Sequence, residues 1–314
     1  GGPGGGPIRP GRLGGDPRPE TDLREEDRRM AGTLTPARWR AVVKDDWRRA
    51  AAGWERFEPQ FLYSLGSVDP ALIRALEPRP GHRLLDIGCG SGEPTLTLAQ
   101  LVAPRGSVLG LDVSPHMLAI GRRRAKSRGV RNVRFRAGDI ARFRAGLPRF
   151  HRAVSRYGLM FVDDIPAALG NIRAALMPGG RAAFAVWGPM ERNPFFAVRV
   201  EATRPFTKAP PPDPERSPHP LRLARPGLLA RLMRRAGFMG VKAVGVHAPL
   251  TYGGIDQYLA MNLSVPSPLR DVYLALSRRD QKRLRDRLAR GMRPFRVGPL
   301  IRAPGFAWVV SGRR

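Results

Sequence analysis

Three glycines at alternate positions follow an aspartate within the segment 82–100, which reads HRLLDIGCGSGEPTLTLAQ. The pattern from Asp86 to Gly92 is D-x-G-x-G-x-G, between an apolar run and a helix-like segment. Glycines in such a turn let the backbone approach a ligand closely, although they also suit a tight turn alone. The pattern is neither the dinucleotide fingerprint, which needs a glycine where Glu93 stands, nor a P-loop, which needs a Lys followed by Ser or Thr.

Acidic residues at the ends of three predicted strands indicate which ligand the turn would hold. Asp86, beside the glycines, would repel a pyrophosphate but suits a ligand that carries positive charge, such as the ammonium and sulfonium of S-adenosylmethionine. Asp112 ends the next strand, where a carboxylate can accept hydrogen bonds from both ribose hydroxyls. Asp139 ends the third strand and can accept from an adenine amino group, while Ile140 and Met117 can pack on the ring.

These residues fall on an alternation of strands and helices. The predicted strands are 83–88, 107–113, 131–137, 151–157 and 180–187, with helices at 93–102, 115–128 and 165–176 between them. The remaining predicted elements are helices at 36–65, 68–77, 226–236 and 255–290, and strands at 240–250 and 305–312. Such alternation is typical of an α/β fold with a doubly wound, mostly parallel sheet.

Four segments in order resemble the motifs of one family. LLDIGCGSG, VLGLDVSPHML, RAGDI and ALMPGGRAAFAVW are similar to motifs of the class I S-adenosylmethionine-dependent methyltransferases, in the small-molecule branch that includes the ubiquinone/menaquinone-biosynthesis enzymes. The resemblance is strong over 80–190 and looser over the last strand. It implies a Rossmann-like seven-stranded sheet whose last strand is antiparallel, with N-terminal helices and an inserted lid.

The resemblance assigns the methionine end of the cofactor to the first and fourth strands. Gly88, Cys89 and Gly90 would bound the methionine moiety, with Asp86 near its amino group. Ser155, at the end of the fourth strand, would offer a backbone carbonyl to the ammonium. We expect Cys89 to be a small buried residue of the turn rather than a catalytic thiol.

The resemblance assigns the nucleoside end to the second and third strands. Asp112 would hold the ribose, and Asp139 with Ile140 would hold the adenine. Met117 is equally compatible with a core position. The residues expected to bind the nucleoside are Asp112, Val113, Met117, Gly138, Asp139 and Ile140.

Composition divides the chain into five segments. Residues 1–30 are rich in Gly and Pro and should form a disordered tail. Residues 31–80 are expected to be an N-terminal helical lid, and 81–190 the S-adenosylmethionine-binding core. Residues 191–235 would be a lid or substrate segment with a Pro-rich loop, and 236–314 the C-terminal part of the sheet and helices.

The charge of the chain leaves its partner open. The 314 residues include 55 Lys and Arg but 26 Asp and Glu, a formal net charge of +29. A basic surface can attract RNA, anionic lipid or an acidic substrate, but we favour solvated helix faces as the explanation of the charge. With one cysteine, no signal-peptide-like start and no apolar run of transmembrane length, we expect a cytoplasmic protein. The sequence does not indicate its oligomeric state.

The expected reaction is transfer of a methyl group to a small hydrophobic or aromatic acceptor, with O- or C-methylation favoured. Tyr157 and Phe161 would form an apolar wall of the acceptor pocket. No residue is predicted as a catalytic base and no metal site is predicted; His247 is a candidate pocket residue and His151 a surface one. The alternatives are an RNA methyltransferase or a catalytically silent S-adenosylmethionine-binding scaffold. The aromatic residues proposed to line the pocket are Trp54, Phe57, Tyr63, Trp187, Phe195 and Phe196.

Overall fold

The computed structural model describes residues 34–144, 146 and 149–314. The expected tail at 1–30 therefore lies outside the described residues. Residues Leu34–Arg314 form one compact unit. No helix among the described residues combines the length and the apolar character that crossing a membrane requires.

A seven-stranded sheet forms the centre of this unit. Its strand order is β3-β2-β1-β4-β5-β10-β6, in which β10 pairs antiparallel with both β5 and β6 and the other pairs are parallel. The strands are β1 (Arg83–Ile87), β2 (Ser107–Asp112), β3 (Val133–Ala137), β4 (Phe150–Arg156), β5 (Leu176–Trp187), β6 (Met239–His247) and β10 (Phe306–Arg313). The predicted Rossmann-like sheet with an antiparallel last strand is confirmed.

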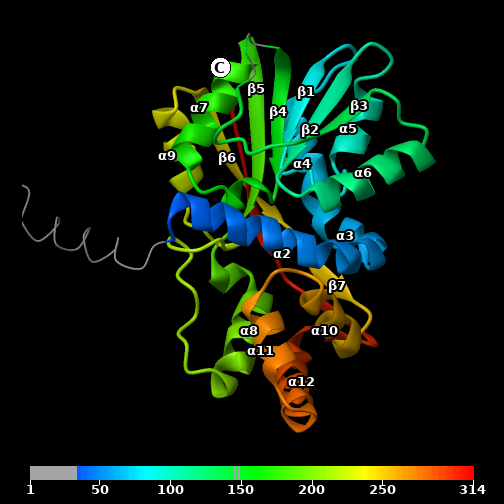
Figure 1. Cartoon of the computed structure of the whole chain (residues 1–314), viewed down its shortest axis with the longest axis vertical. Coiled ribbons are helices and arrows are strands. Elements are labelled where there is room, and N and C mark those ends of the chain that lie inside the picture. Colours follow the sequence, from blue (N-terminus) through cyan, green and yellow to red (C-terminus); the bar gives the residue numbers. More distant parts are fainter. Residues whose placement is uncertain (1–33, 145, 147–148) are drawn as a thin grey trace, which may run out of the picture. The chain divides into compact units, whose positions relative to one another are not determined.

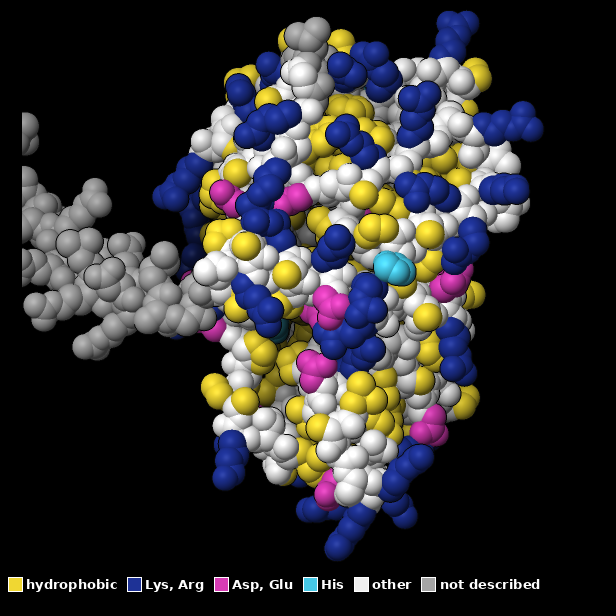
Figure 2. Space-filling model, viewed as in Figure 1, with side chains coloured by type: hydrophobic (Ala, Val, Ile, Leu, Met, Phe, Trp, Pro, Cys, Tyr) yellow, Lys and Arg dark blue, Asp and Glu magenta, His cyan; other side chains and the backbone are white. Residues whose placement is uncertain are grey.

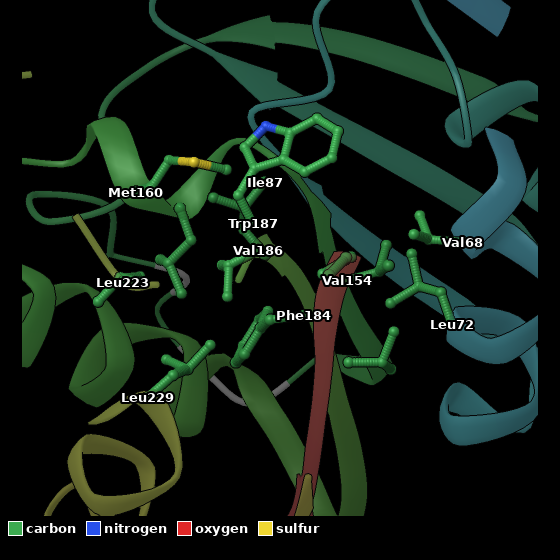
Figure 3. Close-up of a cluster of buried hydrophobic side chains, with 14 of the residues drawn as sticks. Val68, Leu72, Ile87, Val154, Met160, Phe184, Val186, Trp187, Leu223 and Leu229 are labelled. Carbon is green, nitrogen blue, oxygen red and sulfur yellow. The ribbon is translucent and has the colours of Figure 1, made fainter. Parts of the chain in front are cut away.

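Helices flank this sheet and bury its apolar side chains. They are α4 (Asp69–Leu76), α5 (Thr95–Leu101), α6 (Pro115–Ser127), α7 (Ile165–Ala175) and α9 (Leu228–Arg235). Figure 3 shows Phe184 and Val186 of β5 between Leu72 of α4 on one side and Leu223 and Leu229 on the other. Because both faces of β5 are covered, its carboxyl-terminal half is fully apolar and buried.

Two further helices precede the sheet, where the sequence predicted one. α2 (Pro36–Arg56) begins at Thr35, whose hydroxyl accepts from the backbone N–H of Arg38, and ends before Phe57. A second helix, α3 (Glu58–Leu65), then begins with Pro59 in its first turn. A proline there cannot donate a backbone hydrogen bond to the preceding turn, so the helix breaks. In Figure 1, α2 runs across the lower end of the sheet.

A second group of elements lies beyond α2, on the side away from the sheet (Figure 1). Its helices are α8 (Pro194–Thr203), α10 (Ile255–Leu263), α11 (Pro268–Ala275) and α12 (Arg278–Met292). The same group contains a small antiparallel sheet in the order β7-β9-β8. Its strands are β7 (Leu250–Tyr252), β8 (Arg296–Val297) and β9 (Leu300–Ala303). The strand predicted over 240–250 was therefore wrong at its end, because β6 stops at His247 and Leu250 begins a strand of this other sheet.

Candidate active site

One cavity of about 250 Å³ lies at the carboxyl ends of the central strands. Its walls come from the turns after β1, β2, β3 and β4, from α2 and α3, and from the second group of elements through α8, β7 and α10. The sequence-predicted residues that line it are Gly88, Cys89, Gly90, Asp112, Val113, Met117, Gly138, Asp139 and Ile140. The structure thus gathers most of the predicted cofactor residues along one wall.

The glycine turn is fixed by close backbone packing. Gly88 has a φ of 67°, and a Cβ at this position would lie 2.8 Å from the Cα of Gly158 in the turn after β4. The N–H groups of Gly88 and Cys89 both donate to the carbonyl of Leu111. A glycine is therefore required where these two turns meet, at the edge of the cavity.

The Asp112 carboxylate is oriented by two backbone groups. Gly90 N–H donates to its Oδ2 at 2.9 Å, and Ser114 N–H donates to its Oδ1 at 2.8 Å. Burial raises the pKa of this carboxyl, against which the backbone hydrogen bonds act. The backbone N–H of Val113 also acts on this carboxylate. Because a carboxylate can accept about four hydrogen bonds, these donors leave acceptor capacity for a ligand. The side chain is therefore both a link between β1 and β2 and an oriented acceptor on the cavity wall.

Asp139 and Met117, both predicted to bind the nucleoside, also lie in this wall. The N–H of Ala141 donates to Asp139 Oδ1 at 2.9 Å, and Arg142 donates to its Oδ2 at 2.6 Å. Met117 is 2% exposed and packs against Ala51 of α2. Met117 therefore belongs both to the cavity wall and to a small core beneath the lid helix.

Asp86 and Ser155 do not line the cavity. Asp86 is fully buried; its Oδ2 accepts from the Thr95 hydroxyl at 2.6 Å, and its Oδ1 has no hydrogen-bond partner among the described residues. Burial raises the pKa of Asp86 to about 7. The Ser155 hydroxyl donates to the carbonyl of Ile87 at 2.7 Å and accepts from Leu159 N–H, so its side chain holds β1 to the turn after β4.

The residues after Ser155 line the cavity in its place. Arg156, Tyr157 and Gly158 do so, and Phe161 follows them. Tyr157 has a φ of 57°, its ring stacks on Trp187 at 4.3 Å, and its buried hydroxyl finds no hydrogen-bond partner in the described part of the chain. A left-handed backbone at a bulky aromatic residue is strained and tends to occur at functional sites. Tyr157 and Phe161, expected to form an apolar wall of the acceptor pocket, both line the cavity.

α2 is attached to the cavity by its tryptophans. Trp54 Nε1 donates to the hydroxyl of Ser91 in the glycine turn at 3.0 Å, and its ring stacks on Phe61 at 4.2 Å. Trp39 Nε1 donates to the carbonyl of Phe161 at 2.8 Å. This helix therefore contacts both the glycine turn and the turn after β4.

Aromatic side chains dominate the remainder of the cavity. Of the aromatic residues proposed from the sequence, Trp54, Trp187, Phe195 and Phe196 line it. Phe57 does not, and Tyr63 is 73% exposed. Residues of the second group of elements also line the cavity although no sequence signal pointed to them, namely Arg199, Leu250, Tyr252, Met261, Asn262, Val265 and Pro266.

The histidines lie outside the cavity lining. His151 accepts from Arg83 N–H through Nδ1 and stacks on His82 at 4.8 Å, on the opposite end of β1 and β4. His247 is exposed at the end of β6, so its candidacy as a pocket residue was wrong. Within the described ranges, no group of His, Cys, Asp and Glu side chains could hold a metal ion.

Comparison with known proteins agrees with this geometry. Residues 84–180 match the family described as "Methyltransferase domain". Nocamycin O-methyltransferase of Saccharothrix syringae is 31% identical over 208 residues, which are 61% of this chain and 69% of that protein. Aklanonic acid methyltransferase DauC of Streptomyces sp. (strain C5) is 30% identical over 148 residues, 46% of this chain and 65% of that protein. Demethylmenaquinone methyltransferase of Geobacillus stearothermophilus is 32% identical over 109 residues, 35% of this chain and 47% of that protein. The chain thus spans about half to two thirds of the length of the last two of these curated relatives.

Two solved structures share the fold. YcgJ from Bacillus subtilis has a TM-score of 0.51 at 18% identity, covering 80% of this chain and 98% of its own. A putative methyltransferase from Bacillus halodurans C-125 has the same TM-score at 15% identity, covering 78% and 97%. Fold and strand-end site together define the class I S-adenosylmethionine-binding architecture. The chain belongs to the family of S-adenosylmethionine-dependent methyltransferases.

Proposed function

We propose that the protein transfers the methyl group of S-adenosylmethionine to a small hydrophobic or aromatic acceptor, at an oxygen or a carbon. The observation that carries this proposal is the continuity of the cavity, which joins the strand-end carboxylates of β2 and β3 to an aromatic wall formed by Trp187, Phe195 and Phe196. The names of the relatives support the same class of acceptor, since they refer to aklanonic acid, nocamycin and demethylmenaquinone.

The residues present fit S-adenosylmethionine. Asp112 presents oriented acceptors to a diol, and the backbone of Gly88 and Gly90 offers a surface without side chains. The unpartnered Oδ1 of Asp86 is a buried acceptor that a nearby ammonium would stabilise. We assign Gly88, Cys89, Gly90 and Asp86 to the methionine end.

The nucleoside end is assigned to the turns after β2 and β3. Asp112 and Val113 would hold the ribose, and Met117, Gly138, Asp139 and Ile140 the adenine. For the ammonium we favour backbone groups of Arg156–Gly158 over Ser155, because those residues line the cavity.

The protein's contribution to the reaction is alignment and exclusion of water. S-adenosylmethionine, when bound, supplies an activated methyl group on its sulfonium. Trp39 and Trp54 hold α2 over the cavity, and Tyr157 with Trp187 forms a flat apolar wall for an aromatic acceptor. Holding two reactants in line lowers the barrier without a catalytic base. Tyr157 does not supply one, because burial raises the pKa of its hydroxyl far above neutrality.

The high positive charge does not favour an RNA acceptor over a small-molecule acceptor. Figure 2 shows Lys and Arg side chains scattered over the visible face, with Asp and Glu among them, rather than gathered in one stripe. Recognition of RNA usually relies on a concentrated basic surface. On this face, solvated helix surfaces explain the arrangement better.

The proposal is tested by binding and by turnover. The purified protein should bind S-adenosylhomocysteine in calorimetry at micromolar concentrations, and should bind neither NAD nor ATP. A screen of quinols, phenols and enols, followed as release of S-adenosylhomocysteine, should find an acceptor. Binding of NAD or ATP in place of S-adenosylhomocysteine would reject the cofactor; binding without turnover on any acceptor would favour the silent scaffold.

A further inference from the structure

One arginine in the cavity has no carboxylate to balance its charge. Three arginines line the cavity: Arg40, Arg156 and Arg199. Arg40 pairs with Asp163 at 2.6 Å, and Arg156 pairs with Asp69 at 2.8 Å. Arg199, on α8, has no acidic partner among the described residues, and burial lowers its pKa. Arg199 is half-buried. Because withdrawing a charge from water without an acidic partner is costly, such a residue in a cavity wall calls for a functional explanation.

The neighbours of Arg199 are neutral. Its Nη1 donates to Asn262 Oδ1 at 2.8 Å, and its guanidinium carbon lies 4.5 Å from the centre of the Phe196 ring. Tyr252 and Tyr258 are close enough to interact with it electrostatically. Burial raises the pKa of both phenols, that of Tyr258 to about 12, so neither supplies a negative charge near neutral pH.

These contacts leave one edge of the guanidinium available. Asn262 fixes the Nη1 side and Phe196 supports the flat face. Nε and Nη2 have no hydrogen-bond partner within the ranges that the structure describes. That edge of an arginine carries two parallel N–H donors, which match the two oxygens of a carboxylate.

We propose that the methyl acceptor carries a carboxylate, and that Arg199 binds it through its Nε–Nη2 edge in the α8 part of the cavity. The aromatic residues around Arg199 would hold an apolar ring system attached to that acid. This inference rests on the proposed function, since it describes the acceptor of that same site. Arg199 would act as a specificity-determining residue, selecting acids over neutral molecules of the same shape.

The test compares aryl acids with their own carboxamides. A panel from benzoate to anthracene-2-carboxylate, each paired with the neutral amide, is titrated by calorimetry into protein saturated with S-adenosylhomocysteine. In the wild type the best-fitting acid should bind at least about tenfold more tightly than its amide, as expected for a charged hydrogen bond. In Arg199→Gln that preference should disappear.

A matched control separates charge from local contact. Arg204 follows α8 and its side chain is 77% exposed, so Arg204→Gln should keep the full preference for acids. S-adenosylhomocysteine affinity should be equal in all three proteins, which shows that they are folded and keeps the test separate from the proposed function. The inference is overturned if no acid binds the wild type more tightly than its amide, or if the preference survives in Arg199→Gln. Failure to bind S-adenosylhomocysteine would instead reject the proposed function.

Discussion

Replacing Asp112 with asparagine tests the centre of the cofactor assignment. The change removes the charge and one acceptor oxygen but keeps the size of the side chain. In Asp112→Asn the remaining side-chain oxygen can still accept from Ser114 N–H, whereas the new NH2 group would face the N–H of Gly90, which in the wild type lies 2.9 Å from Oδ2. Asparagine is therefore a milder change than alanine, which would remove both the link from Gly90 to β2 and the hydrogen bond from Ser114 within the turn after β2.

The expected loss of affinity follows from the hydrogen bonds to the ligand. A hydrogen bond to a charged group contributes about 1.5–3 kcal/mol, which corresponds to roughly 10- to 150-fold in the dissociation constant. Burial raises the pKa of Asp112, so a neutral amide avoids the cost of burying a charge, and this gain offsets part of the loss of the Gly90 hydrogen bond in the empty protein. We therefore expect weaker binding of S-adenosylhomocysteine with only a small change in melting temperature.

Calorimetry with S-adenosylhomocysteine measures this directly. Asp256→Asn is the control, because Asp256 is 76% exposed in its side chain and pairs with Arg285 on the surface. A loss below about 0.5 kcal/mol for Asp112→Asn, within the range of ordinary surface substitutions, would mean that the ribose is held elsewhere. A large fall in melting temperature with unchanged affinity would assign Asp112 to the turn alone.

Three further substitutions probe the site and its cover. The folded state keeps the Asp86 proton up to a pKa of about 7, whereas the unfolded chain releases it near 3.8, so this carboxyl makes the protein less stable as pH rises between those values. Urea unfolding from pH 4.5 to 7.5 should show that Asp86→Asn removes this decline. If the free energy of unfolding depends on pH in the same way in both proteins, the raised pKa of Asp86 is wrong. Trp54→Phe keeps an aromatic side chain, although a smaller one, and loses the indole N–H that donates to Ser91. It should weaken S-adenosylhomocysteine binding by about 0.5–1.5 kcal/mol; an unchanged dissociation constant in calorimetry would show that this contact does not support cofactor binding. Asp163→Asn leaves Arg40 without its carboxylate and should lower the free energy of unfolding by about 1–3 kcal/mol, against little change for the exposed Asp256→Asn; equal effects in the two variants would refute the role of Asp163 in fastening α2.

The sheet and the cofactor wall were predictable because their signals are local. Asp86, Asp112 and Asp139 each stand at or beside a strand end, and parallel strands bring such ends to one edge of a sheet. Once the strands were recognised, the gathering of these residues needed no further information. The finer distinction that Asp86 is buried behind the turn, while Asp112 lines the cavity, depends on side-chain direction and could not be inferred from spacing.

The acceptor half could not be predicted in the same way. Arg199 lies in PFFAVRVEAT, a helix with apolar residues on several sides, and it is one of 55 basic residues. Its partner Asn262 is 63 residues away, and Tyr252 belongs to a small sheet that the sequence did not indicate. Contacts between short elements distant in the chain are set by tertiary packing, for which a single sequence carries no periodic signal.

The two halves of the cavity are joined at one point of the backbone. A Cβ on Gly158 would lie 2.9 Å from both the Cα of Gly88 and the carbonyl oxygen of Ile87, so the turn after β4 packs directly on the glycine turn. Tyr157, the preceding residue, stacks on Trp187 at the end of β5. Any shift of the glycine turn is therefore passed through Gly158 to the aromatic wall. In the proposed function, this contact would set the position of the cofactor relative to the acceptor, and the strained backbone of Tyr157 lies beside it.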